Sequence, residues 1–73
     1  MKWTRGYVSL RQWDGSSPAV PAWLCGPFAT HRDLTHPRRW KVTHVGTGYF
    51  IMRHVPTLAA AQRFAERLHR LNL

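Results

Sequence analysis

"WKVTHVGTGYFIMRHV", residues 40–55, contains the clearest local structural signal in the chain. Its two halves are rich in β-branched and aromatic residues, which favour β-strands. Between the halves lie Gly46, Thr47 and Gly48, and glycine readily adopts the positive φ angles that a tight hairpin turn requires. The sequence therefore predicts a β-hairpin with strands over residues 40–45 and 49–55.

A helix is predicted directly after this hairpin. Val55 precedes Pro56, which favours an extended backbone at Val55 and ends the strand there. Thr57 is a good N-cap residue for the segment "LAAAQRFAERLHRL", residues 58–71. Apolar side chains recur along this segment at helical spacing and predict a face packed on the sheet. They are Leu58, Ala61, Phe64 or Ala65, Leu68 and Leu71, and the opposite side carries Arg63, Arg67 and Arg70.

Before the hairpin, "WTRGYVSLRQW", residues 3–13, has the period of two that is typical of a strand. One side would carry Tyr7, Ser9, Arg11 and Trp13. The following "DGSSP" consists of turn-forming residues and should end the strand.

Residues 14–39 contain four of the five prolines and show no sustained periodicity. This composition predicts a long, Pro-rich and partly ordered loop, which is unusual inside a small domain. Apolar residues such as Trp23 and Phe28 suggest that part of the loop packs against the rest of the chain. A short helical turn over residues 30–34, ended by Pro37, is the local structure we expect within it.

Together these elements predict a single α+β domain over residues 1–73. A small antiparallel sheet, made of one N-terminal strand and the hairpin, would be covered on one face by the C-terminal helix. The strand over residues 49–55 has apolar side chains on both sides, although a sheet with one solvated face should alternate apolar and polar residues. Either the Pro-rich loop covers the second face with Trp23 and Phe28, or a partner molecule does.

The composition is strongly basic. Eleven Lys and Arg residues against three acidic ones give a formal net charge of +8, which favours an acidic or polyanionic partner. Nine of these cations are Arg, which suits bidentate contacts to phosphate or carboxylate and stacking on aromatic rings. The single cysteine, Cys25, cannot form an internal disulfide, and no apolar secretory signal or membrane span is visible. These features predict a soluble protein of a reducing compartment.

Residues for catalysis or metal binding are sparse. Acid–base catalysis needs positioned carboxylates near a cleft, and three dispersed acidic residues supply little of this. The histidines and the cysteine lack the paired spacing of structural zinc sites. They are Cys25, His31, His36, His44 and His54. We therefore expect no enzymatic activity, no cofactor and no metal.

Exposed arginines and aromatic rings are the candidate binding residues. They suit a protein partner, because Trp, Tyr and Arg are enriched at interface hot spots. They also suit nucleic acid, because cations attract phosphates and rings stack on bases. The candidates are Arg5, Tyr7, Arg11 and Trp13 on the first strand, Trp23 in the loop, and Arg38 and Arg39 after it. The plainer alternative is that Trp3, Trp13, Trp23 and Trp40 belong to the core.

From "MKWTRGYVSLRQWDG" through "HPRRWKVTHVGTGYF" to "FAERLHRLNL", the whole chain resembles the small basic transcription regulators with which Xanthomonas phages bind the host RNA polymerase. The resemblance implies contacts to the large β and β′ subunits, displacement of the sigma factor, inhibition of initiation and assistance past terminators. It also implies a monomer in the host bacterial cytoplasm. It transfers no residue-level motif. It favours a protein-binding regulator over the alternative, a small basic nucleic-acid-binding protein.

Overall fold

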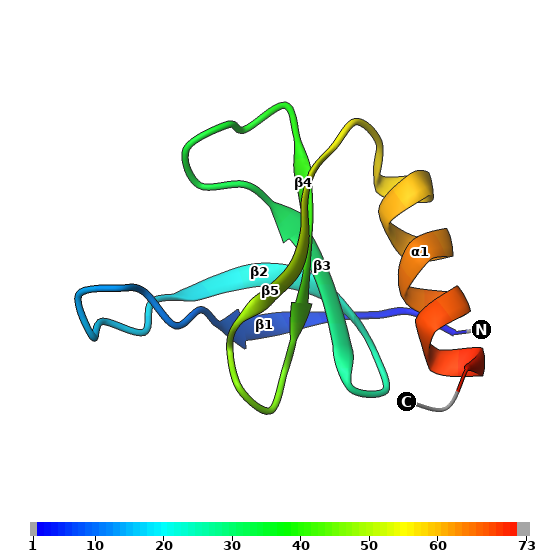
Figure 1. Cartoon of the computed structure of the whole chain (residues 1–73), viewed down its shortest axis with the longest axis horizontal. Helices are drawn as coiled ribbons and strands as arrows, with labels where there is room; N and C mark the ends of the chain where they lie inside the picture. Colours follow the sequence, from blue (N-terminus) through cyan, green and yellow to red (C-terminus); the bar gives the residue numbers. More distant parts are fainter. Residues whose placement is uncertain (1, 72–73) are drawn as a thin grey trace.

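In the computed structural model, which describes residues 2–71, five antiparallel strands form one twisted sheet and a single helix covers part of one face (Figure 1). The strands are β1 (Thr4–Ser9), β2 (Ala19–Cys25), β3 (Phe28–Arg32), β4 (Trp40–His44) and β5 (Phe50–Val55), and the helix is α1 (Leu58–Arg70). Strand order in the sheet follows chain order, so each strand pairs with its neighbours in the sequence. Met1, Asn72 and Leu73, part of the predicted domain, lie outside the described residues.

The α+β class, the β4–β5 hairpin and the helix are confirmed. Strands β4 and β5 lie within one residue of the predicted ranges 40–45 and 49–55, and Gly48 in the turn between them has a φ of 76°. The Thr57 hydroxyl accepts a hydrogen bond from the backbone N–H of Ala60 at 3.1 Å and caps α1. Basic residues fill the last helical turn, where the C-terminal end of the helix dipole favours positive charge.

The predicted long loop over residues 14–39 is wrong, because β2 and β3 both lie inside it. The helical turn expected over residues 30–34 is also wrong, since β3 extends through residue 32. The first strand is shorter than predicted: β1 ends at Ser9, and Arg11 and Trp13 belong to the turn that leads into β2. In that turn the carboxylate of Asp14 accepts hydrogen bonds from the N–H and the hydroxyl of Ser16.

Pro21 is tolerated within β2 because its nitrogen faces away from β1. The N–H of Leu10 donates to the carbonyl of Pro18 at 2.9 Å, so that pair is of the hydrogen-bonded type. Hydrogen-bonded and non-hydrogen-bonded pairs alternate along an antiparallel ladder. Pro21 lies three residues after Pro18 and is opposite Tyr7, so the Tyr7–Pro21 pair is of the non-hydrogen-bonded type. On its other side, β2 pairs with β3 only from Trp23 onward. A residue without an N–H therefore costs no ladder bond on either side.

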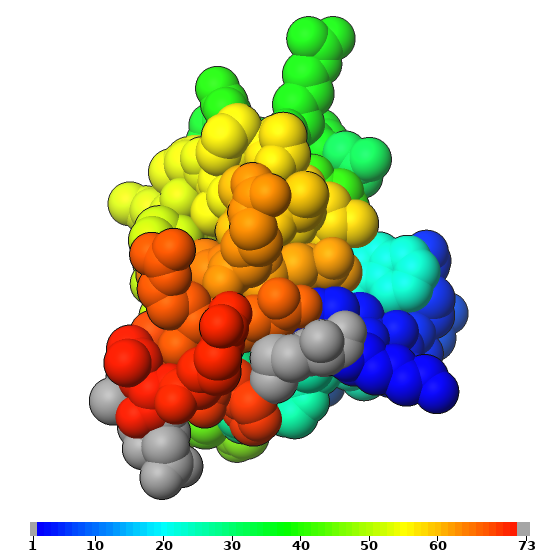
Figure 2. All heavy atoms as spheres, turned by 90° about the vertical axis from the view of Figure 1, so that its right-hand side faces the viewer, coloured from blue at the N-terminus to red at the C-terminus, as the bar shows by residue number. Residues whose placement is uncertain are grey.

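The core consists of two apolar clusters, one on each face of the sheet. On the helix side, Val42 packs with Ala61 and Ala65 of α1, and partly buried rings surround them. Figure 2 views the molecule from this side, with the N-terminal segment lying against the helix. The indole N–H of Trp3 donates to the carboxylate of Glu66 at 2.8 Å and fixes this contact. Trp3 is therefore partly buried and packs against the helix-side cluster.

The second cluster lies on the opposite face and consists of Val8, Leu10, Ala22 and Ala29. The sheet curls around this face: the N–H of Arg11 donates to the carbonyl of Gly48 at 2.8 Å and joins the β1–β2 turn to the β4–β5 turn. Curling, not a covering loop, buries most of this face. Strand β5 is an edge strand and remains exposed along most of its length.

Candidate functional site

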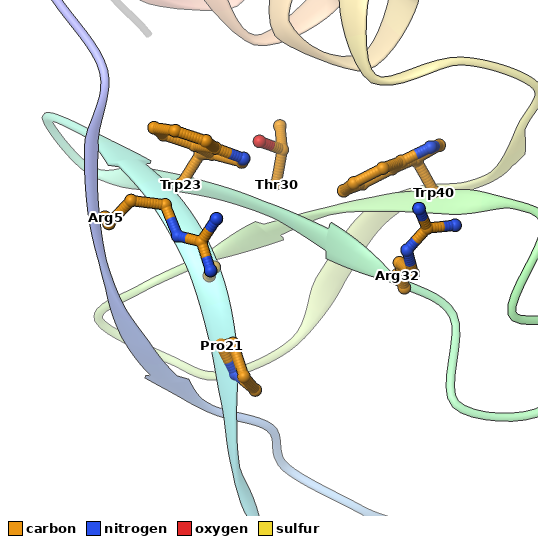
Figure 3. Close-up of a pocket in the computed structure, with 7 residues that line it drawn as sticks. Arg5, Pro21, Trp23, Thr30, Arg32 and Trp40 are labelled. Atoms are coloured by element: carbon orange, nitrogen blue, oxygen red, sulfur yellow. The ribbon is translucent and has the colours of Figure 1, made fainter.

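A cleft opens on the helix side where β2 and β3 part (Figure 3). It has a volume of about 370 Å³. Seven residues line this feature, which we call the Arg–Trp cleft: Arg5, Pro21, Ala22, Trp23, Thr30, Arg32 and Trp40. The strand register explains why they meet. Cross-strand partners point to the same face, and Arg5 is opposite Trp23, Trp23 is opposite Thr30, and Arg32 is opposite Trp40.

Two arginines in the cleft make cation–π contacts with tryptophan rings. The guanidinium carbon of Arg5 lies 4.8 Å from the ring centroid of Trp23, and that of Arg32 lies 4.7 Å from the ring centroid of Trp40. The guanidinium of Arg32 also donates to the backbone carbonyl of Pro37 at 2.8 Å. These contacts order both groups, and the remaining N–H donors stay available for an acceptor.

Among residues 2–71, no acidic side chain lines the Arg–Trp cleft. The carboxylate of Asp14 bonds to Ser16, and that of Glu66 bonds to Trp3. Asp33 is buried next to Lys41, whose amine lies 4.0 Å from its carboxylate. Burial alone would raise the pKa of Asp33, but hydrogen bonds from the N–H and hydroxyl of Thr35 and the charge of Lys41 lower it overall. The charge of the cleft is therefore positive and is not neutralised from within.

Thr30 supplies a buried hydroxyl at the back of the cleft. Its side chain is 0% exposed, and its oxygen has no hydrogen-bond partner among residues 2–71. Figure 3 shows this side chain between those of Trp23 and Trp40. A buried hydroxyl without a partner costs about 1–3 kcal/mol, so native proteins seldom keep one without a reason. A bound polar group would satisfy it.

The neighbouring buried polar group, His31, is fully bonded and belongs to the opposite face. Its Nδ1 lies 3.0 Å from the carbonyl of Arg32 and its Nε2 lies 2.7 Å from the hydroxyl of Thr43. A carbonyl can only accept, so Nδ1 carries the proton and Nε2 accepts from Thr43. Burial lowers the pKa of His31, with a smaller contribution in the same direction from the charge of Lys41. His31 is thus a structural, neutral histidine.

Three side chains could hold a metal ion. One ligand atom each from Asp33, His36 and His54 lies within 4.8 Å of the other two. His54 has a φ of 62°, in the left-handed region, and its ring lies 4.9 Å from that of His36. Of the five residues weighed from spacing, the structure thus brings together only His36 and His54. The amine of Lys41 near the Asp33 carboxylate opposes a cation there.

The structure brings together two of the seven predicted binding residues, Arg5 and Trp23, in the Arg–Trp cleft. Tyr7 is 71% exposed and lines a shallow hollow beside it with Arg5 and Pro21. Trp13 is 96% exposed at the β1–β2 turn, which excludes it from the core. Arg11 lies over the ring of Tyr49 with 5.8 Å to its centroid. Arg38 and Arg39 are exposed between β3 and β4 and are not among the residues that line the cleft.

Sequence reasoning missed Thr30 and Arg32 and treated Trp40 as a core ring. Trp40 is half-buried and does pack on the helix-side cluster, but it also forms a wall of the cleft. Nothing in the local sequence marks Thr30. Arg32 could have been found only after β3 was recognised, because residues two positions apart on a strand lie on the same face, and Arg32 follows Thr30 by two.

A second surface is the exposed edge strand. Tyr49, Phe50, Ile51 and Met52, which we call the β5 apolar strip, are all more than one-third exposed. Cations border the strip: the amine of Lys41 lies 4.9 Å from the ring centroid of Phe50, and the guanidinium of Arg53 lies 5.3 Å from it. Monomeric proteins usually protect edge strands, so an exposed apolar edge marks a surface suited to a partner.

No family model, curated protein sequence or solved structure matches this chain. Within residues 2–71, no helix is long and apolar enough to cross a membrane. The Arg–Trp cleft and the β5 apolar strip offer hydrogen-bond donors, ring faces and apolar area. Groups of these kinds are suited to binding and orienting another molecule.

Proposed function

We propose that the protein is a non-enzymatic regulator that binds the β and β′ subunits of bacterial RNA polymerase and displaces the sigma factor. Transcription initiation is thereby inhibited, and elongating polymerase is helped past terminators. The resemblance over the whole chain motivates this function. The observation that supports it best is the β5 apolar strip with its border of cations.

The β5 apolar strip has the composition of a protein interface. An apolar and aromatic centre with a charged rim is the usual arrangement at protein–protein contacts, and Tyr and Arg are enriched among the residues that contribute most. The unpaired backbone of an edge strand can also accept a strand from a partner. Phosphate-driven binding would not require four neighbouring apolar side chains at the surface. A partner, and not a covering loop, is therefore the better explanation for apolar residues on both sides of β5.

The β1–β2 turn provides a second contact region. It projects from the body of the sheet and carries the exposed ring of Trp13 (Figure 1). The backbone bond between Arg11 and Gly48 joins this turn to the β4–β5 turn, so the two regions are held in one orientation. A ligand with two linked contact regions gains effective affinity without a large interface at either one.

Displacement needs no force on sigma itself. A ligand that binds core polymerase and is incompatible with bound sigma shifts the equilibrium by its differential affinity for the two forms. Sigma lowers the affinity of the regulator by the same factor. A protein of 8.5 kDa is large enough for this mechanism.

Incubation with a Xanthomonas RNA polymerase holoenzyme, without DNA and at about 0.15 M salt, tests the proposal. After size exclusion, we expect the protein to elute with polymerase and sigma to be reduced in those fractions. Ile51→Glu and Trp13→Ala should weaken co-elution while circular dichroism remains native. Arg63→Ala, which removes an exposed charge from the helix, is the matched control and should bind normally.

Two results would contradict the proposal. One is the absence of co-elution, with sigma fully retained on that holoenzyme. The other is a complex that forms only when nucleic acid is present and whose affinity falls steeply and linearly with the logarithm of salt concentration, as for a phosphate-driven binder. The second result would favour the alternative class, a small nucleic-acid-binding protein.

A further inference from the structure

We propose that the Arg–Trp cleft binds one nucleotide of a single-stranded nucleic acid. Phosphate oxygens would be held by the guanidinium groups of Arg5 and Arg32, and the base would lie between the walls formed by Trp23 and Trp40. This inference is independent of polymerase binding, because different side chains carry it. Its basis is the geometry of the cleft and the charge around it.

The two guanidinium groups are prepared for an oxyanion. Each guanidinium carbon is held over an aromatic ring, and a guanidinium is a planar fork of N–H donors that matches the geometry of phosphate. The guanidinium of Arg5 makes no hydrogen bond within residues 2–71, and that of Arg32 uses one nitrogen for the carbonyl of Pro37. Less side-chain entropy is lost when a phosphate binds, because the cation–π contacts already order both groups.

The cleft has the size and walls for a base. Its volume of about 370 Å³ lies in the range of small-molecule sites. Two indoles from different strands border it, and Pro21 adds a rigid wall (Figure 3). Stacking of a base on an aromatic side chain is largely independent of sequence, because every base has a π-face. The site should therefore accept different bases.

The hydroxyl of Thr30 supplies the polar contact at the back of the cleft. It lacks a partner in the free protein and can both donate and accept, so either a base N–H or a carbonyl oxygen would satisfy it. A purely aliphatic ligand would leave it unsatisfied. The orphaned hydroxyl is therefore an observation independent of the two cation–π contacts, and it also points to a polar ligand.

Charge favours a nucleic acid over an acidic peptide. The formal net charge is +8, and the few carboxylates are engaged elsewhere in the fold. A polyphosphate backbone that leaves the cleft continues to interact with the surrounding positive field, including Arg38 and Arg39, whereas a single peptide carboxylate interacts only with the cleft. A duplex presents no free base faces and should not enter the cleft.

The test is a fluorescence anisotropy titration of labelled, short single-stranded RNA and DNA at about 0.15 M salt. We compare Arg5→Ala/Arg32→Ala with Arg63→Ala/Arg70→Ala, which removes the same charge from the exposed side of α1. The cleft pair should lower affinity by about tenfold or more, and the helix pair by a much smaller factor. The RNA and DNA arms show whether the 2′-hydroxyl contributes.

Two further variants keep the test decisive if the double variant fails to fold. Arg5 is exposed, so Arg5→Ala alone should keep the native circular dichroism spectrum and still weaken binding. Thr30→Val keeps the shape of the side chain and should weaken binding of the single strand without destabilising the free protein.

Equal losses from the cleft pair and the helix pair would overturn the proposal, because general electrostatic attraction would then explain the binding. Equal affinity for a duplex of the same sequence would also overturn it. An acidic peptide of the same net charge that binds as tightly, and competes with the oligonucleotide, would show that the cleft recognises carboxylates instead of nucleotides.

Discussion

Replacement of Thr30 by Val should stabilise the free protein, although it removes a polar group from a well-packed sheet. Thr30 is 0% exposed, its hydroxyl has no partner among residues 2–71, and it lies directly opposite Val42. Thr and Val have nearly the same shape and both favour strands. The substitution therefore changes polarity and little else.

The magnitude follows from the cost of the orphaned hydroxyl. Measurements on protein variants put a buried hydroxyl without a hydrogen bond at about 1–3 kcal/mol. Part of this is offset because a methyl group is slightly larger than a hydroxyl in a packed site. We expect a gain of about 1 kcal/mol in the free energy of unfolding, which corresponds to a rise in Tm of about 4–8 °C for a domain of this size.

Urea denaturation followed by circular dichroism measures this gain as a higher midpoint at unchanged slope. Thr43→Val is the matched control. Thr43 is equally buried on the adjacent strand, but its hydroxyl donates to Nε2 of His31 at 2.7 Å. That variant should lose about 1–3 kcal/mol, because the histidine nitrogen loses its partner. If Thr30→Val is destabilised like Thr43→Val, the Thr30 hydroxyl has a partner in solution and the reasoning is refuted.

Three other perturbations have definite expected outcomes. Burial keeps the pKa of His31 below its usual value of 6.5; the unfolded state therefore binds more protons, and the stability from the neutral ring, complete above pH 6.5, is lost as pH falls through the lowered pKa. Denaturation at several pH values should show this loss, and His31→Asn should remove that part of the slope. Gly48→Ala places a Cβ 2.8 Å from the carbonyl oxygen of Ser9 at a φ of 76°, and should cost more than about 1 kcal/mol in a thermal melt. Trp13→Ala, at a ring that is 96% exposed, should leave Tm within about 2 °C of the parent protein. A large drop would place that ring in a contact absent from the structure.

The helix and the β4–β5 hairpin could be predicted because their signals are local. Thr57 caps α1 by a bond to a residue three positions away, and the β4–β5 turn is marked by Gly46 and Gly48, of which Gly48 has a positive φ. Strands β2 and β3 were missed because Pro21 interrupts the pattern of β2, and a proline is normally excluded from a paired strand. Only the register shows that its nitrogen faces an unpaired side.

The candidate site could be predicted only in part for the same reason. Arg5 and Trp23 are conspicuous residue types, but their contact depends on a register between strands nearly twenty residues apart. Thr30 has no local signal at all. Its importance comes from the absence of a partner, and that is a property of the packed molecule. Sequence reasoning therefore identified residue types capable of binding, whereas the cleft they form depends on pairing at a distance.

The meander order of the strands also affects how the molecule is made. During synthesis each strand can pair with the preceding strand as soon as it leaves the ribosome, because every strand pairs only with its neighbours in the sequence. The Arg–Trp cleft has all its walls once β4 has paired, before α1 has emerged. The helix then closes the domain last, and the bond from Trp3 to Glu66 joins the first-made part of the chain to the last. We therefore expect ribosome-bound nascent chains to acquire the sheet before the helix docks.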